Sequence, residues 1–450
     1  MPKRDSTLLR AAFLTAIPEE PSQYDQVDPK FMFLPAAHFR ALEPSAMLVK
    51  GIRGAGKSFW WHALQNDNIR RVVLLGNVTT SAGFGEGDGQ DRPDRDVLAE
   101  MLDAGHEPRL IWKAVALRHF IAASGIDIEL PSQWRELAEW VRDDAQRVAD
   151  LLRRADQTLA HRNQTHVVLF DALDRTAASD GHRQALLRGL LELVLELRPR
   201  ACLRAKIFAR PDMLDHPDVR TFPDASKVLT TAVQLDWSRL DLYGLLFTYL
   251  GNGSEDAAAE FRTLTRDKWK EDVLGWQLPN SLRTDAEEQA RVFVLLAGPH
   301  MGTNPRRGMT YPWLPNHIGD AHGKVSPRSF LAAMRRAAET PPSPGQGRAL
   351  TWRGLHAGVR AASDVRAGEI KDDLAWAYDA MTALRDLVVP CEQEKVLGRW
   401  KKNTVRSPIV ALKELIRAGV IAEMPEGKLN VPDLYRVGFG LRRKGGLAPT

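Results

Sequence analysis

Residues 46–61 read AMLVKGIRGAGKSFWW and carry the strongest signal in the chain. An apolar run, 46–49, leads into a glycine-rich turn, and a stretch of helical character follows Ser58. Residues 51–58 satisfy the pattern G-x-x-x-x-G-K-[ST] in full, with the strand before it and the helix after it that the pattern requires. The sequence therefore predicts a loop that binds the phosphates of a nucleotide.

The residue types in this loop suit a polyphosphate. Glycines remove the Cβ atoms that would hold phosphate away from the backbone N–H groups, and the helix that follows points its positive dipole end at the same anion. Lys57 is expected to contact the β- and γ-phosphate oxygens, and Ser58 to offer a hydroxyl to Mg²⁺. The predicted nucleotide-binding residues are Gly51, Arg53, Gly54, Ala55, Gly56, Lys57, Ser58 and Phe59.

A second informative stretch is HVVLFDALDR, residues 166–175. Its apolar part predicts a short buried strand closed by Asp171, which we assign to the Mg²⁺ shell through water. Asp174 is expected to orient or deprotonate the attacking water. Structural roles remain open for both: a helix cap for Asp171, and a cap or a salt bridge with Arg175 for Asp174.

The segment AKIFAR, residues 205–210, predicts a third core strand that ends at Arg210. Ligands of open parallel sheets bind at the carboxyl ends of the strands. Arg210 is therefore expected to sense the γ-phosphate and neutralise developing charge. The alternative is a salt bridge with Asp212 or Asp215.

The remaining segments complete a predicted α/β core over 46–235, after an irregular lead-in over 1–45. RVVLLGNV (71–78) and VLTTAVQL (228–235) are predicted strands that bring the mostly parallel sheet to five. Apolar residues at helical spacing over about 97–160 predict a helical insertion. The Gly- and Asp-rich segment 81–96 is expected to be a surface loop or a substrate-facing lid.

Amphipathic helices predict a helical lid over 236–340, followed by a linker over 341–349. In GKVSPRSF, Ser326 and Pro327 open a helix and place Arg328 in its first turn. A cation is unfavourable at a helix N-terminus, so Arg328 is expected to face an anion.

The C-terminal part, 350–450, has the order of a winged helix-turn-helix domain: a helix over 369–388, two short helices, then two extended runs around a turn at 425–427. From Cys391 onward, twelve Lys and Arg stand against six Asp and Glu, so the basic excess of the chain lies here. Binding of duplex DNA and docking of a protein both remain open. The cations expected to meet phosphates are Lys401, Lys402, Arg406, Lys413, Arg417, Arg442, Arg443 and Lys444.

With these motifs placed, the chain resembles the additional-strand P-loop ATPases, and within them the AAA+ and STAND/KAP-type NTPases. The resemblance implies that the Arg210 strand lies between the phosphate-loop strand and the Asp171 strand. It makes Arg210 the first sensor and Arg328 the second sensor. It also implies ATP and Mg²⁺ as cofactors, a winged helix after the lid, and a homo-oligomer or an effector protein as partner.

This chain departs from the AAA+ pattern after Asp171, where Ala172 replaces the usual glutamate. The hydrolytic role then shifts to Asp174, and the resemblance implies an ATP-driven switch with slow hydrolysis. Bacterial members of this broad group frequently serve in conflict systems such as phage defence. The alternative is a signalling or scaffold ATPase that oligomerises and docks an effector without DNA. Arg175 and Arg220 are weak candidates for an arginine finger.

Composition excludes several classes of protein. The chain has 450 residues and a formal net charge of +5, and it contains two cysteines. That number is too small for a disulfide framework or a zinc site, which suits a reducing cytoplasm. No apolar run approaches the ~20 residues of a membrane span, so we expect no membrane partner.

Overall fold

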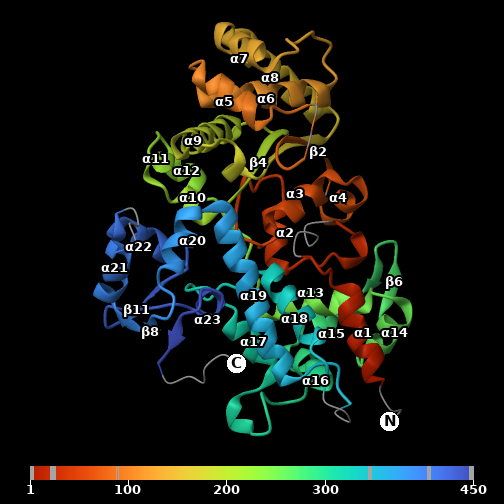
Figure 1. Cartoon of the computed structure of the whole chain (residues 1–450). Helices are drawn as coiled ribbons and strands as arrows, with labels where there is room; N and C mark the ends of the chain where they lie inside the picture. The colour runs from red at the N-terminus through yellow and green to blue at the C-terminus, as the bar shows by residue number, and fades with distance from the viewer. Residues whose placement is uncertain are drawn as a thin grey trace. The chain divides into compact units, whose positions relative to one another are not determined.

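The chain divides into two compact units (Figure 1). The sheet unit spans Leu34–Asp236, and the helical unit combines Met1–Phe33 with Trp237–Thr450. The computed structural model describes residues 5–20, 27–74, 76–87, 89, 91–342, 347–402 and 407–444.

A five-stranded sheet with every pairing parallel forms the centre of the sheet unit. Its order, β2-β3-β4-β1-β5, places β4 between β1 and β3. The strand that precedes Arg210 therefore lies between the strands that precede the phosphate loop and Asp171, which confirms the predicted α/β fold of a P-loop NTPase. The strands are β1 (Leu48–Lys50), β2 (Asn77–Phe84), β3 (Gln164–Phe170), β4 (Leu203–Ala209) and β5 (Val233–Gln234).

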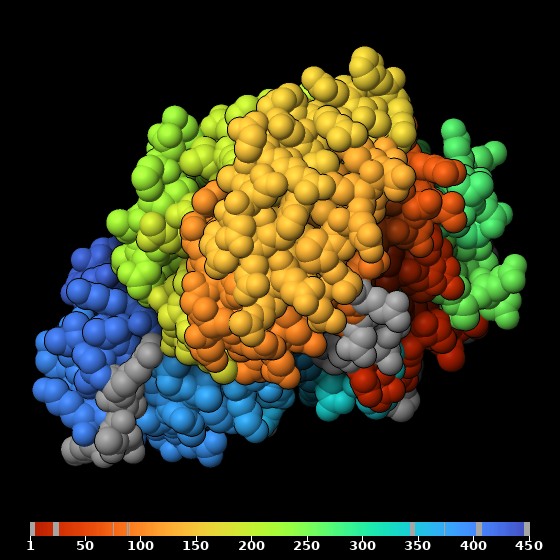
Figure 2. Space-filling view, turned by 90° about the horizontal axis from the view of Figure 1, so that it is seen from above, coloured from red at the N-terminus to blue at the C-terminus, as the bar shows by residue number. Residues whose placement is uncertain are grey.

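Helices surround this sheet, and four of them form the predicted insertion between β2 and β3. Trp112 of the insertion packs edge-on against Phe84 and Phe170 of the sheet, with ring centroids 5.9 and 5.5 Å away. The outer surface of the insertion faces the viewer in Figure 2, coloured orange to yellow. The insertion comprises α5 (Arg95–Asp103), α6 (Pro108–Ser124), α7 (Trp134–Asp143) and α8 (Ala145–His161); the other helices are α2 (Ala36–Leu42), α3 (Lys57–Gln65), α4 (Asp67–Val73), η3 (Leu173–Arg175), α9 (Asp180–Leu197), α10 (Pro211–Leu214), α11 (Pro217–Arg220) and α12 (Ala225–Leu229).

Two strands of the sheet unit do not lie where the sequence predicts them. The segment 71–78 is not one strand, because Asn66 caps α4 through its side chain and the helix takes the chain to Val73. The strand β2 starts only at Asn77 and continues to Phe84, into the segment predicted as a loop. The segment 228–235 likewise begins as the end of α12, and only Val233–Gln234 pairs with β1.

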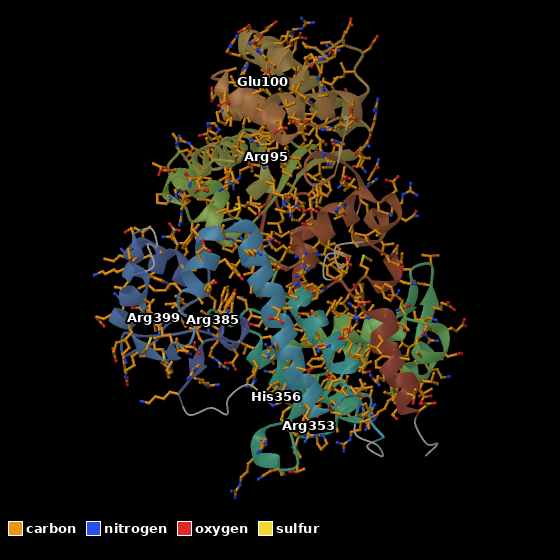
Figure 3. All side chains as sticks on the ribbon, viewed as in Figure 1. Arg95, Glu100, Arg353, His356, Arg385 and Arg399 are labelled. Carbon is orange, nitrogen blue, oxygen red and sulfur yellow. The ribbon has the colours of Figure 1, made fainter. Side chains whose placement is uncertain are left out.

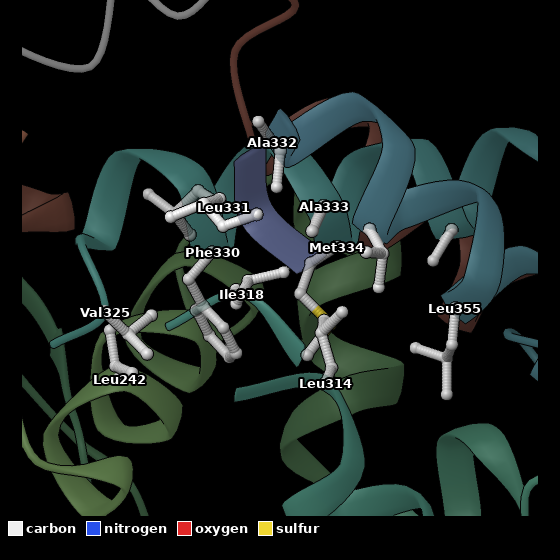
Figure 4. Close-up of a cluster of buried hydrophobic side chains, with 14 of the residues drawn as sticks. Leu242, Leu314, Ile318, Val325, Phe330, Leu331, Ala332, Ala333, Met334 and Leu355 are labelled. Carbon is white, nitrogen blue, oxygen red and sulfur yellow. The ribbon is translucent and has the colours of Figure 1, made fainter. Parts of the chain in front are cut away.

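The helical unit has a separate apolar core around α18, whose Phe330 and Met334 lie among Leu242, Leu314 and Ile318 (Figure 4). Gly354 and Gly358 of α19 let this helix approach α18 closely, because a Cβ atom at either position would come within 2.5 Å of a backbone oxygen of α18. Outside the C-terminal domain, the elements of this unit are α1 (Ser6–Ala16), η2 (Pro29–Phe31), α13 (Arg239–Gly251), α14 (Glu255–Arg262), β6 (Lys270–Asp272), β7 (Gly275–Gln277), α15 (Asn280–Thr284), α16 (Ala286–Ala297), η4 (Pro305–Arg307), α17 (Thr310–His317), α18 (Pro327–Glu339) and α19 (Trp352–Asp373).

The N-terminal segment is more ordered than the predicted lead-in. Asp5 caps α1 by accepting from two backbone N–H groups, and Leu9 and Phe13 enter the core of the helical unit. The prolines that follow suggested irregular structure throughout, but the apolar spacing before them forms a regular helix. Part of the predicted linker 341–349, residues 343–346, lies outside the described residues.

The C-terminal elements form the predicted winged helix-turn-helix arrangement. A three-stranded antiparallel sheet of order β10-β11-β9 packs with three helices, and buried Trp400 donates its indole N–H to the Ala380 carbonyl at 2.7 Å. The helix predicted over 369–388 is instead the end of α19 followed by a separate α20. The elements are α20 (Ala375–Thr382), β8 (Val388–Val389), β9 (Cys391–Glu392), α21 (Gln393–Lys402), α22 (Pro408–Arg417), β10 (Ala422–Glu423), β11 (Lys428–Asn430), α23 (Asp433–Arg436) and β12 (Arg442–Arg443).

Across the part of the chain that the structure describes, no helix is both long and apolar enough to cross a lipid bilayer.

Candidate functional site

The phosphate loop connects β1 to α3 in the conformation that its glycines permit. Gly54 and Gly56 have φ angles of 67° and 95°, in the left-handed region that side chains disfavour. Gly56 directly precedes α3, so the unpaired N–H groups of that helix begin at Lys57 and Ser58. The loop thus presents backbone donors and a helix N-terminus at one edge of the sheet.

Lys57 curls back over this loop. Its ammonium donates to the carbonyls of Gly51 and Ile52, both at 3.0 Å. Burial lowers the pKa of Lys57 to about 8, and the nearby Asp171 carboxyl acts in the opposite direction. A bound polyphosphate would supply the negative charge that keeps this ammonium protonated.

Asp171 lies directly after β3, and the Ser58 hydroxyl is near enough to act on the pKa of its carboxyl. Burial raises the pKa of Asp171 to about 6, against the effects of the Ser58 hydroxyl and the charge of Lys57. Its Oδ2 atom is buried without a hydrogen-bond partner. A buried carboxylate oxygen without a partner beside a hydroxyl fits a hard cation such as Mg²⁺.

No group of three or more His, Cys, Asp or Glu side chains that could hold a metal occurs among the described residues. Mg²⁺ is usually held by one or two protein oxygens together with substrate phosphates and water. Ser58 and Asp171 would hold the ion here, and it would supply charge neutralisation at the phosphates.

Arg210 follows β4 and is fixed by two carboxylates. Its Nη1 donates to Asp174 at 2.8 Å, and its Nε and Nη2 donate to the two oxygens of Asp212, both at 3.2 Å. Burial opposes the charge on Asp212, but Arg210 and Arg53 outweigh it, so the pKa of Asp212 is lowered. The guanidinium is therefore held in one orientation by a bidentate contact.

Sequence reasoning treated Asp212 only as an alternative salt-bridge partner of Arg210, and did not foresee that it orients the arginine beside the phosphate loop. The signal was present, since Pro211 and Asp212 open a short helix directly after the strand.

The structure brings five predicted residues together and leaves one in the other unit. Lys57, Ser58, Asp171, Asp174 and Arg210 share the carboxyl edge of the sheet. Arg328 lies at the start of α18 in the helical unit, where it pairs with Glu369 at 3.0 Å. Its predicted contact with nucleotide therefore remains a prediction.

The other predicted loop residues also lie in this loop or the first turn of α3. The charge of Arg53 acts on Asp212, Ala55 is buried, and the Phe59 ring packs edge-on against Trp60 at 5.1 Å. Of the arginine-finger candidates, Arg175 pairs with Glu86 and Arg220 with Asp215, both on the surface.

Comparison with known proteins gives structural likeness alone. No family model matches the chain, and no curated protein matches it. Among solved structures, the chain is similar to the Walker-type ATPase of Pyrococcus abyssi, at 14% identity, with 91% of this chain and 99% of that chain covered and a TM-score of 0.41. It is also similar to the ORC2 protein of Aeropyrum pernix, at 13% identity, with 92% and 97% covered and a TM-score of 0.40.

A third similar structure is the ORC1 protein of Aeropyrum pernix in complex with DNA, at 13% identity, with 90% of this chain and 92% of that chain covered and a TM-score of 0.32. All three TM-scores lie below 0.5. The assignment of a P-loop NTPase fold therefore rests on the strand order and the phosphate loop of this chain.

Proposed function

We propose that this chain is a Mg²⁺-dependent ATP-binding switch that hydrolyses ATP slowly. The observation that carries the proposal is the meeting of Lys57, Ser58 and Asp171 at the edge where three parallel strands end. Glycine-supported backbone donors, one ammonium and a buried carboxylate are the groups that a nucleoside triphosphate with Mg²⁺ requires.

The proposed roles follow from position. Lys57 neutralises the β- and γ-phosphate oxygens, and Ser58 with Asp171 holds Mg²⁺. Arg210, oriented by Asp212, reports the γ-phosphate, and Arg328 acts as a second sensor from the helical unit. Asp174 orients the water, but its carboxylate already accepts from Arg210. Because Ala172 also lacks a carboxylate, hydrolysis is slow.

We propose DNA as the target of the switch, contacted through the winged helix. Lys413 and Arg417 are exposed on α22, the second helix of the helix-turn-helix, and Lys401 is exposed at the end of α21. Lys402 and Arg406 add charge in sequence, but the Lys402 side chain and Arg406 lie outside the described residues. Service in phage defence is the biological setting that the family resemblance suggests.

The test measures phosphate release from ATP with and without a duplex of random sequence. Hydrolysis should be slow alone and should rise when duplex DNA is added, and duplex affinity should fall steeply with salt. K413Q/R417Q should remove the stimulation but leave basal hydrolysis unchanged. An ATPase that is indifferent to DNA at low salt would rule out the DNA target but leave the nucleotide switch standing.

One observation favours a second candidate, docking of a protein effector. Ile409 and Val410 at the start of α22 are 58% and 46% exposed, and Met424 beside the wing turn is 38% exposed. Apolar side chains on a face that would read base edges suit a protein partner better. Light scattering with ATP or ADP tests it: nucleotide-dependent assembly that I409S/V410S abolishes, without any duplex binding, supports docking.

A further inference from the structure

A second cationic surface lies on the helical unit, outside the winged helix. It is formed by the loop 302–309, α17 and the first turns of α19. We call it the arginine–ring surface and define it by three arginines and three rings: Arg306, Arg307, Arg353, Trp313, His317 and His356.

The charge of this surface is not neutralised locally. Residues 298–319 and 347–363 contain five arginines and no aspartate or glutamate. Arg306, Arg307 and Arg353 make no ion pair with any described residue, whereas other arginines of this unit, among them Arg266, Arg291, Arg335 and Arg336, pair with carboxylates. Unpaired guanidiniums gathered on one surface favour a polyanionic ligand.

The rings form a fixed group beside these arginines. His317 stacks on Trp313 with centroids 4.0 Å apart and is held by a hydrogen bond between its Nδ1 and the Trp313 carbonyl at 2.7 Å. His356 meets the same indole edge-on at 4.5 Å. Trp352 meets His356 in turn at 5.9 Å, and Arg353 lies over the Trp352 ring.

The arginines and the rings of this surface lie next to each other. Arg353 and His356 are exposed on the same side of α19, where Figure 3 labels both, and the whole loop from residue 303 to Met309 is exposed. Burial, followed by the positive charges of His317 and Arg307, lowers the pKa of His356. A Cβ atom at Gly308, the residue after Arg307, would lie 3.7 Å from the Trp313 indole, so the arginine loop adjoins the ring group.

We propose that the arginine–ring surface binds single-stranded nucleic acid, with the arginines on the phosphates and the rings stacking against unpaired bases. Arginine forks match phosphate oxygens, and stacking of bases on aromatic rings tolerates any sequence. A duplex hides its base faces, so the ring group has no role there. The inference does not depend on the proposed duplex contact of the winged helix.

The test uses the full chain and fluorescein-labelled 30-nucleotide DNA, single-stranded or duplex, in anisotropy titrations at several salt concentrations. R306Q/R307Q/R353Q should weaken single-strand binding at least about tenfold and reduce its salt slope by about two. The matched control, R266Q/K268Q/R336Q, removes the same charge from exposed positions of the same unit and should bind as the parent does. His356→Ala should weaken single-strand binding and leave duplex binding unchanged.

Two results would overturn the inference. One is a triple variant that binds single strands as the control does while its circular dichroism is native. The other is a parent chain that binds vesicles with anionic lipids but no single-stranded DNA. K413Q/R417Q separates this inference from the proposed function, because that variant should lose duplex binding and keep single-strand binding.

Discussion

Ala172, directly after the proposed metal aspartate, has a φ angle of 53°. A left-handed backbone costs an L-residue about 1–2 kcal/mol, and non-glycine residues adopt it mainly where surrounding structure or function requires it. The turn redirects the chain between β3 and the short helix that carries Asp174. The strain therefore lies between the two carboxylates of the site.

Ala172→Gly should stabilise the sheet unit by about 1 kcal/mol, because glycine adopts this φ without a steric penalty. Thermal unfolding without nucleotide measures the change. Ala122→Gly, at an exposed position of α6, is the matched control and should destabilise by up to about 1 kcal/mol. Equal losses of stability in both variants would contradict a strained Ala172.

Lys57→Ala should abolish ATP binding and leave the fold intact. The ammonium makes two hydrogen bonds to its own loop, so its removal costs little stability, whereas the polyphosphate loses its principal cation. Calorimetry with ATP and Mg²⁺ measures the affinity, and Lys227→Ala, an exposed lysine on α12, is the control. ATP affinity equal to that of the parent chain would overturn the site.

At the scale of elements, the sequence predicted the end of a strand correctly where a residue of the predicted site directly follows an apolar run. The ends of β1, β3 and β4 were predicted because Gly51, Asp171 and Arg210 follow short apolar runs. It failed at β2 and β5, the two edge strands. The segment 71–78 contains a short apolar run at 72–75, and such a run does not distinguish a buried helix from a strand.

In the site, too, the residues of the sequence motifs were predicted, and the contacts that depend on the folded chain were not. The pattern predicted Lys57, Ser58 and Asp171, whereas the salt bridge of Arg210 with Asp212 was only an alternative and the left-handed Ala172 was not predicted. The left-handed Ala172 depends on the geometry of the turn after β3, and one sequence does not encode that geometry as a recognisable pattern. The ion pair between Arg328 of α18 and Glu369 of α19 joins two residues 41 positions apart in the chain, and the sequence did not predict it.

The sheet unit should lose stability in mild acid because it buries neutral histidines. Burial lowers the pKa of His38 and His119 to about 4 and that of His166 to about 3. The native state keeps these rings neutral, while the unfolded chain takes up protons below pH 6.5. Stability is thus full above about pH 6.5 and is lost as the pH falls toward 4.

In that pH range, each histidine lowers the free energy of unfolding by about 1.4 kcal/mol for every pH unit of acidification. Urea unfolding of the sheet unit at pH 7, 6, 5 and 4.5 should show the loss. The two ring nitrogens of His166 lie 2.9 Å from the hydroxyls of Thr79 and Ser81. The neutral ring accepts a hydrogen bond from one hydroxyl and donates one to the other. His166→Gln should reduce the slope by about a third, and a slope that does not change would argue against this origin.

At the scale of the whole molecule, the two separate cores predict two unfolding transitions. Phe13 is fully buried in the core of the helical unit. Phe13→Ala should lower the free energy of unfolding of the helical unit by about 3–5 kcal/mol. The transition of the sheet unit should not change. Scanning calorimetry resolves the two, and ATP with Mg²⁺ should raise only the transition of the sheet unit.

The matched control is Phe120→Ala, since Phe120 is fully buried in the core of the sheet unit. It should shift the nucleotide-sensitive transition instead. A single transition that moves equally in both variants would mean that the units unfold together.

The helix α1 has a consequence for synthesis on the ribosome. Arg10 donates from its Nε to the Ala338 carbonyl at 2.6 Å, across 328 residues of chain. Translation at about 5–20 residues per second separates the emergence of these partners by on the order of 15–60 seconds. During that interval the whole sheet unit leaves the ribosome and can close around its own core, while Leu9 and Phe13 still lack the elements that bury them. The first helix of the chain is therefore among the last to reach its place, and an apolar nascent segment of this kind is a natural client for a chaperone.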